Sequence, residues 1–320
     1  TAKLAVTGTT AISATGQTVE LDTATNDFTG AVTVTGGATT LKDANDLTVS
    51  LTTSGATALT AGGDLTLDGT VNGATSDLTT TAAATSFGAT TVGQDLSVTA
   101  TGAVIDTGKL AVTGTTAISA AGQTVTLDDA SNDFTKEVTV IGGATTLKDA
   151  NDLTVSLTTS GSTALTAGGD LTVDGTVSEA TSDLTTVAAA TSFGATTVGQ
   201  DLSVTATGAV IDTGKLAVTG TTAISAAGQT VTLDDASNDF TKEVTVIGGA
   251  TTLKDANDLT VSLTTSGSTD LTAVDTLIVD GTVSLSTSDL TTAAAATSFG
   301  ATTVGQNLSV TATGAVIDTG

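Results

Sequence analysis

Apolar and polar residues alternate along almost the whole chain in short runs. Segments such as 110–114 (LAVTG), 153–157 (LTVSL) and 202–206 (LSVTA) place apolar residues at every second or third position, with Thr, Ser or Ala between them. This near-period of two predicts strands with one buried face, each about four to six residues long. Gly, Asn, Asp and Ser separate the runs and supply turn conformations. No segment shows the period of an amphipathic helix, so we expect an all-β chain of many short strands.

A longer repeat organises these strands. The string KLAVTGTTAIS begins at Lys3, Lys109 and Lys215, so three units span residues 3–108, 109–214 and 215–320. Units one and two differ at 12 positions, and units two and three differ at 9. A long fixed period is typical of an array of structural modules. We expect the units to form one continuous rod, and the absence of Met predicts a segment of a longer array.

Three all-β architectures use short strands and tight turns. A β-sandwich needs longer hairpin strands, and a propeller needs blades of about 40–50 residues with aromatic signatures. A β-solenoid has coils of about 20 residues whose strands pair with the coils on either side. Fourteen or fifteen strand-like segments per unit, taken three to a coil, give about five coils of roughly 21 residues. We therefore predict a parallel β-helix, right-handed because parallel crossovers prefer that hand.

The interior of a narrow coil has room for Val, Leu, Ile and Ala but for few rings. We expect Leu65, Val98, Leu171, Phe193 and Val204 to point inward and to stack on their equivalents in neighbouring coils. The six Phe residues are interpreted as core rather than as a ligand platform, because isolated Phe without Trp or Tyr is a weak ligand surface.

Composition removes most kinds of chemistry. The chain contains no His, Cys, Trp, Tyr, Arg or Pro. The usual nucleophile–base pairs and a zinc site of His and Cys ligands therefore cannot be built. Paired carboxylates that hydrolyse glycosides need a cleft with two opposed acids, which a regular rod does not offer. We expect the protein not to be an enzyme and to use no cofactor other than calcium.

The charge balance restricts the partners. Asp and Glu number 33 against 8 Lys, which gives a net charge of −25. Binding to nucleic acid needs clustered Lys or Arg, so we expect no nucleic-acid partner. No apolar run approaches the length of about 18 residues that indicates a transmembrane helix, so we expect no membrane insertion.

Asp and Asn recur at the predicted corners, as DANDL (43–47, 149–153 and 255–259) and as DDASNDF (128–134 and 234–240). Alternating Asp and Asn oxygens can bind calcium, although neither a calcium β-roll nonapeptide nor an EF-hand loop is present. Asx turns, in which the side chain bonds to the backbone, are the preferred alternative. Weak calcium binding is predicted at Asp43, Asn45, Asp46, Asp128, Asp129, Asn132, Asp133, Asp149, Asn151 and Asp152.

A second acidic pattern precedes strands, at Asp46, Asp64, Asp77 and Asp95. The interval from Asp64 to Asp77 is shorter than the two equal intervals on either side of it. These unequal spacings do not show which carboxylates stack on one another.

The strings TLKDANDLTVS, TAGGDLTVDG and LDDASNDFTKEVTVIGGATT resemble the repeats of filamentous-haemagglutinin-like exoproteins. These are very large adhesins exported by two-partner secretion or autotransporter routes, and the resemblance covers essentially the whole chain. It implies a right-handed parallel β-helix exposed at the surface of a Gram-negative-type bacterium.

We therefore expect an extracellular structural protein, either a surface filament or matrix fibre or the rod-like stalk of a giant adhesin. Its expected partners are copies of itself and an unknown surface ligand. One alternative is an ice-binding solenoid that presents ranks of Thr, and another is a surface that binds a glycan or a protein partner. Ice binding needs the same TxT pair on every coil, and the shifting Thr pairs and variable coil lengths argue against it.

Overall fold

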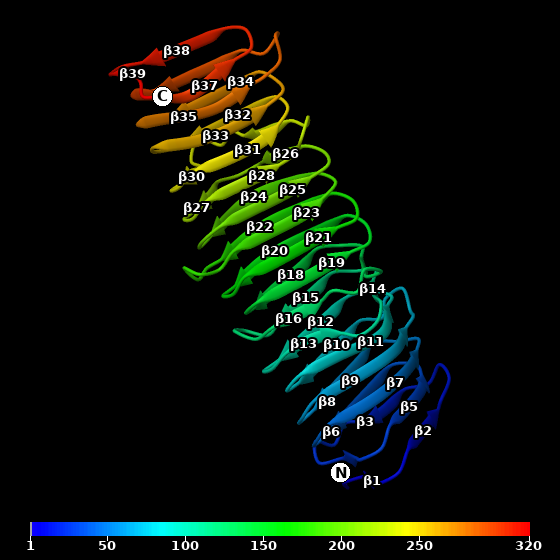
Figure 1. Ribbon diagram of the computed structural model, residues 1–320. Coiled ribbons are helices and arrows are strands. Elements are labelled where there is room, and N and C mark those ends of the chain that lie inside the picture. Colours follow the sequence, from blue (N-terminus) through cyan, green and yellow to red (C-terminus); the bar gives the residue numbers. More distant parts are fainter. Residues whose placement is uncertain (1) are drawn as a thin grey trace. The chain divides into compact units, whose positions relative to one another are not determined.

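The computed structural model describes residues 2–320, and these residues form strands but no helix. The chain consists of two compact units, of which the first ends at Thr159 and the second begins at Ser160. Within each unit the chain winds in coils, and each strand pairs in parallel with strands of the coils before and after it (Figure 1). Each unit is therefore a β-solenoid, as the alternating pattern predicts.

The first unit has two strand faces. Face 1a contains β2 (Thr10–Ser13), β5 (Val32–Gly36), β7 (Leu47–Thr53), β9 (Leu65–Val71), β11 (Thr85–Val92), β13 (Val104–Asp106), β14 (Leu110–Val112), β16 (Val125–Leu127), β17 (Asp133–Phe134) and β19 (Thr145–Asp149). Face 1b contains β3 (Val19–Leu21), β6 (Thr39–Asp43), β8 (Thr57–Ala61), β10 (Leu78–Ala82), β12 (Leu96–Ala100), β15 (Thr116–Ser119), β18 (Val138–Gly142) and β20 (Leu153–Thr159). In the first coil, β1 (Ala5–Val6) pairs with β4 (Asp27–Phe28).

The second unit is built in the same way. Face 2a contains β21 (Thr163–Ala167), β23 (Leu184–Ala188), β25 (Leu202–Ala206), β28 (Thr222–Ser225), β31 (Val244–Gly248), β33 (Leu259–Thr265), β35 (Thr276–Val283), β37 (Ala296–Val304) and β39 (Val316–Asp318). Face 2b contains β22 (Leu171–Val177), β24 (Thr191–Val198), β26 (Val210–Asp212), β27 (Leu216–Val218), β29 (Val231–Leu233), β30 (Asp239–Phe240), β32 (Thr251–Asp255), β34 (Thr269–Ala273), β36 (Leu290–Ala294) and β38 (Leu308–Ala312).

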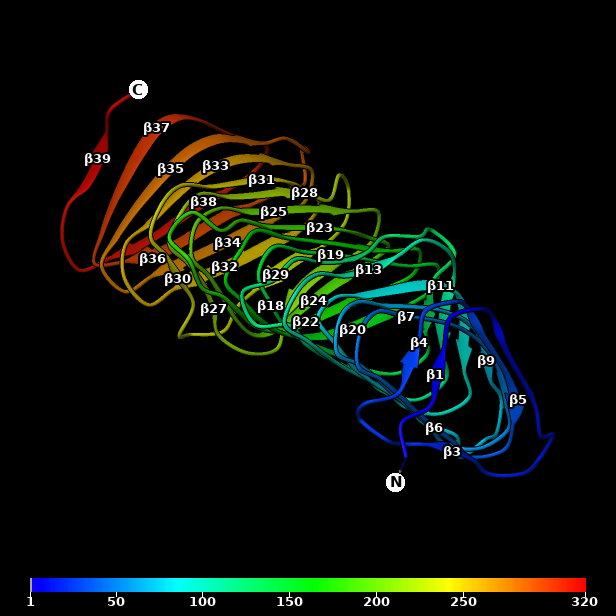
Figure 2. The ribbon, with the colours of Figure 1, turned by 90° about the horizontal axis from the view of Figure 1, so that it is seen from below.

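Most coils consist of two strand faces rather than the three strands per coil assumed from the sequence. Figure 2 shows the strands of each unit running around an enclosed interior. Coil length varies, because the path from Thr10 to its partner Val32 is longer than the path from Val32 to its next partner, Val49. The corners absorb these differences, so the strands themselves stay in register.

The sequence repeat does not contain a whole number of coils. Between β2 and its copy β15 in the next repeat, the chain crosses from one face to the other eleven times, which corresponds to five and a half coils. The prediction of about five coils is therefore confirmed. The additional half coil changes the face on which a copied strand lies. Each copied strand lies on the opposite face of its unit, since β2 is on face 1a and β15 is on face 1b, and likewise β21 and β34 are on faces 2a and 2b.

The core consists of inward ranks that run from coil to coil. One rank on face 1b stacks Leu59, Thr80, Val98, Ile118, Val140 and Leu157. Leu65, Val98, Leu171, Phe193 and Val204 are all at most 1 % exposed, which confirms the predicted inward faces. Phe28, Phe87, Phe134, Phe193 and Phe240 are buried as predicted for core residues, and Phe299 in the last coil is half-buried.

A bulge recurs where β9 meets β11. Gly69 has a φ of 115°, and a Cβ placed there would overlap the carbonyl oxygen of Leu51 in the preceding coil. Only glycine combines this positive φ with such a close approach of two backbones. The pairing register shifts between Phe87 and Thr90 at the same place, which bends the strand locally.

Candidate functional site

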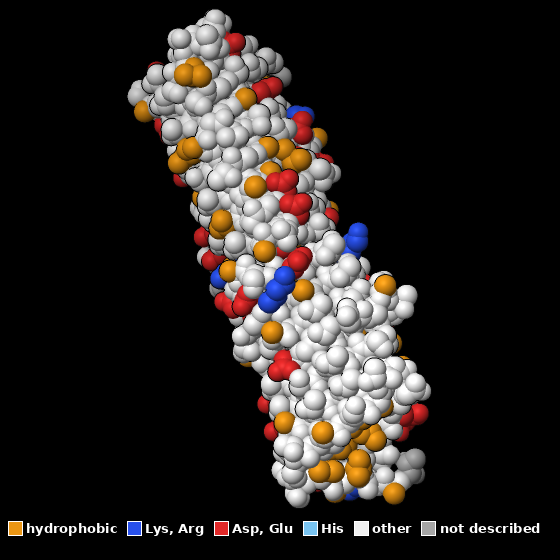
Figure 3. Space-filling model, turned by 90° about the vertical axis from the view of Figure 1, so that its right-hand side faces the viewer, with side chains coloured by type: hydrophobic (Ala, Val, Ile, Leu, Met, Phe, Trp, Pro, Cys, Tyr) orange, Lys and Arg blue, Asp and Glu red, His pale blue; other side chains and the backbone are white. Residues whose placement is uncertain are grey.

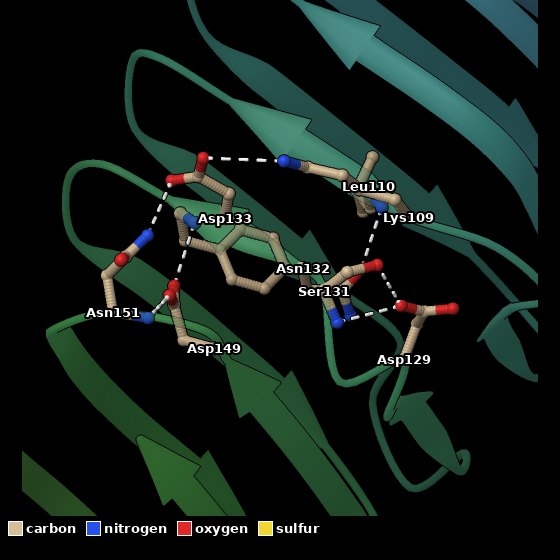
Figure 4. A network of polar contacts seen from close by, with 9 residues as sticks. Lys109, Leu110, Asp129, Ser131, Asn132, Asp133, Asp149 and Asn151 are labelled. Carbon is tan, nitrogen blue, oxygen red and sulfur yellow. Dashed lines mark hydrogen bonds and ion pairs between the residues drawn. The ribbon is translucent and has the colours of Figure 1, made fainter. Parts of the chain in front are cut away.

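The Asp- and Asn-rich motifs meet at one corner of the coil. We call this cluster the corner network and define it by Lys109, Asp129, Ser131, Asn132, Asp133, Asp149 and Asn151 (Figure 4). Its side chains come from the bends beside the short strands β14, β17 and β19. β17 has only two residues, and the N–H of its second residue, Phe134, is accepted by a side chain rather than by a backbone carbonyl.

Asp149 ends β19 with a buried carboxylate, only 3 % exposed. One carboxylate oxygen accepts the backbone N–H of Phe134 at 2.7 Å, and the other accepts that of Asn151 at 2.8 Å. The Asn151 contact is an Asx turn, and the Phe134 contact ties two successive coils together. Burial raises the pKa of the Asp149 carboxyl, while the two backbone hydrogen bonds act in the opposite direction.

Asn132 is the fully buried member of the network. Its Oδ1 accepts the N–H of Leu110 at 2.7 Å, and its Nδ2 donates to Asp106 at 2.5 Å. Asp106 ends β13 and also accepts the backbone N–H groups of Asp128 and Asp129 at 3.0 and 3.2 Å. Asp106 was not predicted as a site residue, although its place as the last residue of the strand VID near the end of each repeat was a usable signal.

The remaining members lie nearer to solvent. Asp129 accepts hydrogen bonds from the hydroxyl and the backbone N–H of Ser131, and these bonds lower the pKa of its carboxyl. Asp133 forms an ion pair with Lys109 at 3.6 Å and accepts a hydrogen bond from Asn151 at 3.4 Å. Exposed pairs of this kind contribute at most about 1 kcal/mol.

The network recurs in the other repeats. Asp43 accepts the N–H groups of Phe28 and Asn45 at 2.9 Å, and Asp255 accepts those of Phe240 and Asn257. Asn238 repeats both hydrogen bonds of Asn132. Asn26 accepts the N–H of Leu4, but its amide donates to the carbonyl of Leu21 instead of to an Asp.

The second acidic pattern forms short stacks on the coil edges. Asp46 accepts the backbone N–H of Asp64 at 2.9 Å, and Asp77 accepts that of Asp95 at 3.3 Å. The members of each pair therefore lie in adjacent coils, whereas the shorter interval from Asp64 to Asp77 separates the two stacks. Each carboxylate supplies the acceptor that a bent backbone lacks at the corner. On the face seen in Figure 3, acidic side chains lie among uncharged side chains and backbone.

The corner network has limited capacity for calcium. Both carboxylate oxygens of Asp43 and Asp149 accept backbone N–H groups, and Oδ1 of Asn132 is used in the same way. The side chains of Asn45, Asp46, Asp128, Asn151 and Asp152 are exposed. Among residues 2–320, no three acidic side chains lie close enough together to hold a metal ion. The arrangement is built to cap strands, and loose calcium binding stays a prediction.

Comparisons with known proteins give a family and no individual relative. No curated protein and no solved structure matches the chain. The profile of a family described as repeats of unknown function (DUF5649) matches residues 1–35, 75–141 and 181–247. The second and third matches are offset by one period of the sequence repeat, and the matches together cover more than half of the chain. The chain therefore belongs to this family of repeats of unknown function, DUF5649.

Proposed function

We propose that the chain is a structural, non-catalytic protein of the cell exterior. It forms part of a surface filament or matrix fibre, or of the rod-like stalk of a giant adhesin, on a Gram-negative-type bacterium. The observation that carries the proposal is the coil-on-coil construction of each unit, in which every added coil extends the same two faces and the same core. In such a construction each added repeat lengthens the rod and packs on its neighbour in the same way as the repeats before it.

The polar groups of the molecule support a structural role. The oxygens of the buried Asp and Asn side chains of the corner network, and of their copy Asn238, accept hydrogen bonds from backbone N–H groups. These side chains therefore stabilise the corners, and they do not form a pair of groups suited to catalysis. Cysteine is absent from the sequence, so disulfides cannot form, and the repeated capping supplies stability in their place. The resemblance of TLKDANDLTVS and TAGGDLTVDG to filamentous-haemagglutinin-like repeats favours the same role.

The proposed partners are copies of the chain and a surface ligand of unknown identity. Nucleic acid is not proposed, because a net charge of −25 repels phosphate. None of the described residues forms a helix that is long and apolar enough to cross a membrane.

Localisation on the native cell tests the proposal. Antibodies raised against this chain should label intact, unpermeabilised cells in immunogold electron microscopy, along fibres or projections. A strain that lacks the gene is the matched control for the label. Labelling confined to permeabilised cells would overturn the proposal.

A second candidate, ice binding, gains support from the strand register. Outward Thr60, Thr81 and Thr99 are aligned on β8, β10 and β12, and Thr79 aligns with Ser97 beside them. Only this single rank is aligned: of these three strands β10 alone has the full pair of Thr79 and Thr81, and Thr79 is matched by Ala58 on β8 and by Ser97 on β12, so the Thr pairs do not recur on every coil. Neighbouring hydroxyls in such a rank lie about 4.8 Å apart along the coil axis.

An ice-growth assay separates the two candidates. If the ranks bind ice, the chain should inhibit ice recrystallisation, and Thr81→Lys should abolish this activity. Thr75→Lys, in the exposed loop between β9 and β10, is the matched control. Inactivity of the unmodified chain would eliminate this candidate.

A further inference from the structure

In each unit, the strands of one face carry no charged side chain over six consecutive coils. In the second unit these strands are β21, β23, β25, β28, β31 and β33 of face 2a. Their outward residues form two ranks, which are Ala164, Thr185, Ser203, Ala223, Thr245 and Ser262, and Thr166, Val187, Thr205, Ser225, Ile247 and Thr264. A charge returns in the next coil, where Asp280 is aligned with Ser262.

The first unit has the same surface on face 1b, on β8, β10, β12, β15, β18 and β20. Its ranks run from Ala58 to Ser156 and from Thr60 to Thr158. They differ from the ranks of the second unit at one position, where Thr81 corresponds to Val187. We call these two surfaces the uncharged faces.

The other face of each unit carries charge. Asp68 is exposed on face 1a, and Asp174 and Asp270 are exposed on face 2b. Because the net charge is −25, two copies of the chain repel each other wherever carboxylates face carboxylates. The strands of the uncharged faces present no like charge to a second copy, so two copies approach each other at the lowest electrostatic cost there.

The uncharged face of the second unit has a raised part and a hollow side by side. Ile247 is 43 % exposed, although the inward residues of its strand are buried. Ile141 occupies the same place in the first unit and is 42 % exposed. The hollow beside Ile247 is lined by Ser203, Thr205, Ala223 and Ser225 among others. A large apolar side chain therefore stands next to a place where the side chains are small.

This relief is complementary to itself. A contact between two identical surfaces has two-fold symmetry, so a raised part and a hollow on the same surface can fill each other. A two-fold axis that runs parallel to the strands, midway between β28 and β31, places β31 of each copy opposite β28 of the other. Ile247 then lies opposite Ser225, and Thr245 lies opposite Ala223, so the larger side chain meets the smaller one in both ranks.

We propose that the uncharged face is a lateral interface between two copies of this chain. The copies pair face to face with antiparallel coil axes, and Ile247 of each copy packs on the small side chains of β28 in the other. Ile141 packs on β15 in the same way. In this register Asp280 lies opposite Thr185, so the paired strands bring no two carboxylates together. The inference rests on the proposed role as a fibre and specifies how one fibre contacts another.

The size of the contact predicts weak, reversible pairing. In this register β25, β28, β31 and β33 of one copy overlap the same four strands of the other. Strands about 4.8 Å apart and about 16 Å long give an overlap of roughly 300 Å². Two such faces amount to about 600 Å² per copy, at the low end of specific interfaces. Because charges outside the contact repel, salt that screens them should strengthen the pairing.

A charge placed on the uncharged faces tests the proposal. Ile141→Asp with Ile247→Asp changes exposed positions, so this variant should keep its circular dichroism spectrum. Its association constant, measured by sedimentation equilibrium, should be at least about tenfold below that of the unmodified chain. The matched control is Ile105→Asp with Ile211→Asp, at positions that are 36 % and 37 % exposed on faces 1a and 2b. The control should pair as the unmodified chain does.

An exchange of large and small side chains tests the register. Ser119→Ile with Ser225→Ile brings Ile opposite Ile, and the association constant should fall about tenfold. Adding Ile141→Ser and Ile247→Ser exchanges the two positions in each unit and again places every Ile opposite a Ser. This fourfold variant has the composition of the unmodified chain, and its association constant should return to within about threefold of the original value.

The outcomes separate the register, the face and the function. A fourfold variant that does not regain pairing would overturn the register, and an Ile→Asp variant that pairs like the unmodified chain would overturn the assignment of the face. A chain that stays monomeric at every concentration and salt level would overturn the pairing and leave these faces to ice, the second candidate. A monomeric chain together with labelled fibres on cells would reject the lateral contact and leave the proposed function standing. Pairing together with a label confined to permeabilised cells would reject the function and leave the contact standing.

Discussion

Replacing Asn132 by Ala removes the buried centre of the corner network. The Leu110 N–H loses its acceptor at 2.7 Å, and Asp106 loses a donor at 2.5 Å. Both Asn132 and Leu110 are fully buried, so water cannot replace these bonds without opening the coil. An unsatisfied buried polar group costs about 1–3 kcal/mol, so two such losses should destabilise the closed form of this corner by about 2–6 kcal/mol.

Hydrogen exchange measures this cost where it arises. The amide of Leu110 should exchange roughly 30-fold faster or more in Asn132→Ala, since local opening free energy sets the exchange rate. Amides of β7 and β9, several coils away, should change little because repeat stability is shared mainly between neighbours.

The first repeat supplies the matched control. Asn26→Ala removes the same side chain from a coil in which Leu4 is 41 % exposed and the amide donates to a backbone carbonyl. Asn26 itself is only 2 % exposed, but its partner Leu4 is not buried, so solvent can replace the acceptor of the Leu4 N–H and the effect should stay below that of Asn132→Ala. Equal effects of the two substitutions, or unchanged exchange at Leu110, would refute the reasoning.

Four further outcomes follow from the structure. Thr80→Val should raise the free energy of unfolding by about 1 kcal/mol in urea titrations, because its buried hydroxyl has no hydrogen-bond partner. Gly69→Ala should cost several times more than Gly16→Ala in the same assay, since a Cβ at Gly69 overlaps a backbone carbonyl oxygen whereas one at Gly16 meets nothing within 4 Å. The raised pKa of Asp149 means that the folded state binds this proton more tightly than the unfolded state does. Its contribution to the free energy of unfolding therefore falls as pH rises from 3.8 through the raised pKa. Asp149→Asn should remove this part of the pH dependence of the free energy of unfolding between pH 3 and 7. Millimolar calcium should raise the melting temperature modestly through screening and loose coordination, and complete unfolding by a chelator would show that the acidic corners bind calcium tightly.

The alternation of side chains determined most of the fold. Leu65, Val98 and Leu171 point inward because a period of two leaves a strand only one apolar face. Short strands, frequent glycines and the absence of a helical period left the solenoid as the best match among all-β architectures. Local chemistry also indicated the Asx turns at Asp43 and Asp149, because such a side chain reaches the amide two residues ahead in any context.

Contacts between coils depend on the tertiary structure, because they join residues 15 to 26 positions apart through corners of unequal length. The pairing of Asn132 with Asp106 and the stacking of Asp46 on Asp64 follow from the register, which short-range patterns do not specify. The half coil in each repeat could not be predicted for the same reason, because it depends on the lengths of the corners. The sequence period shows that the pattern recurs, but only the summed lengths of the coils place β2 and β15 on opposite faces of the solenoid.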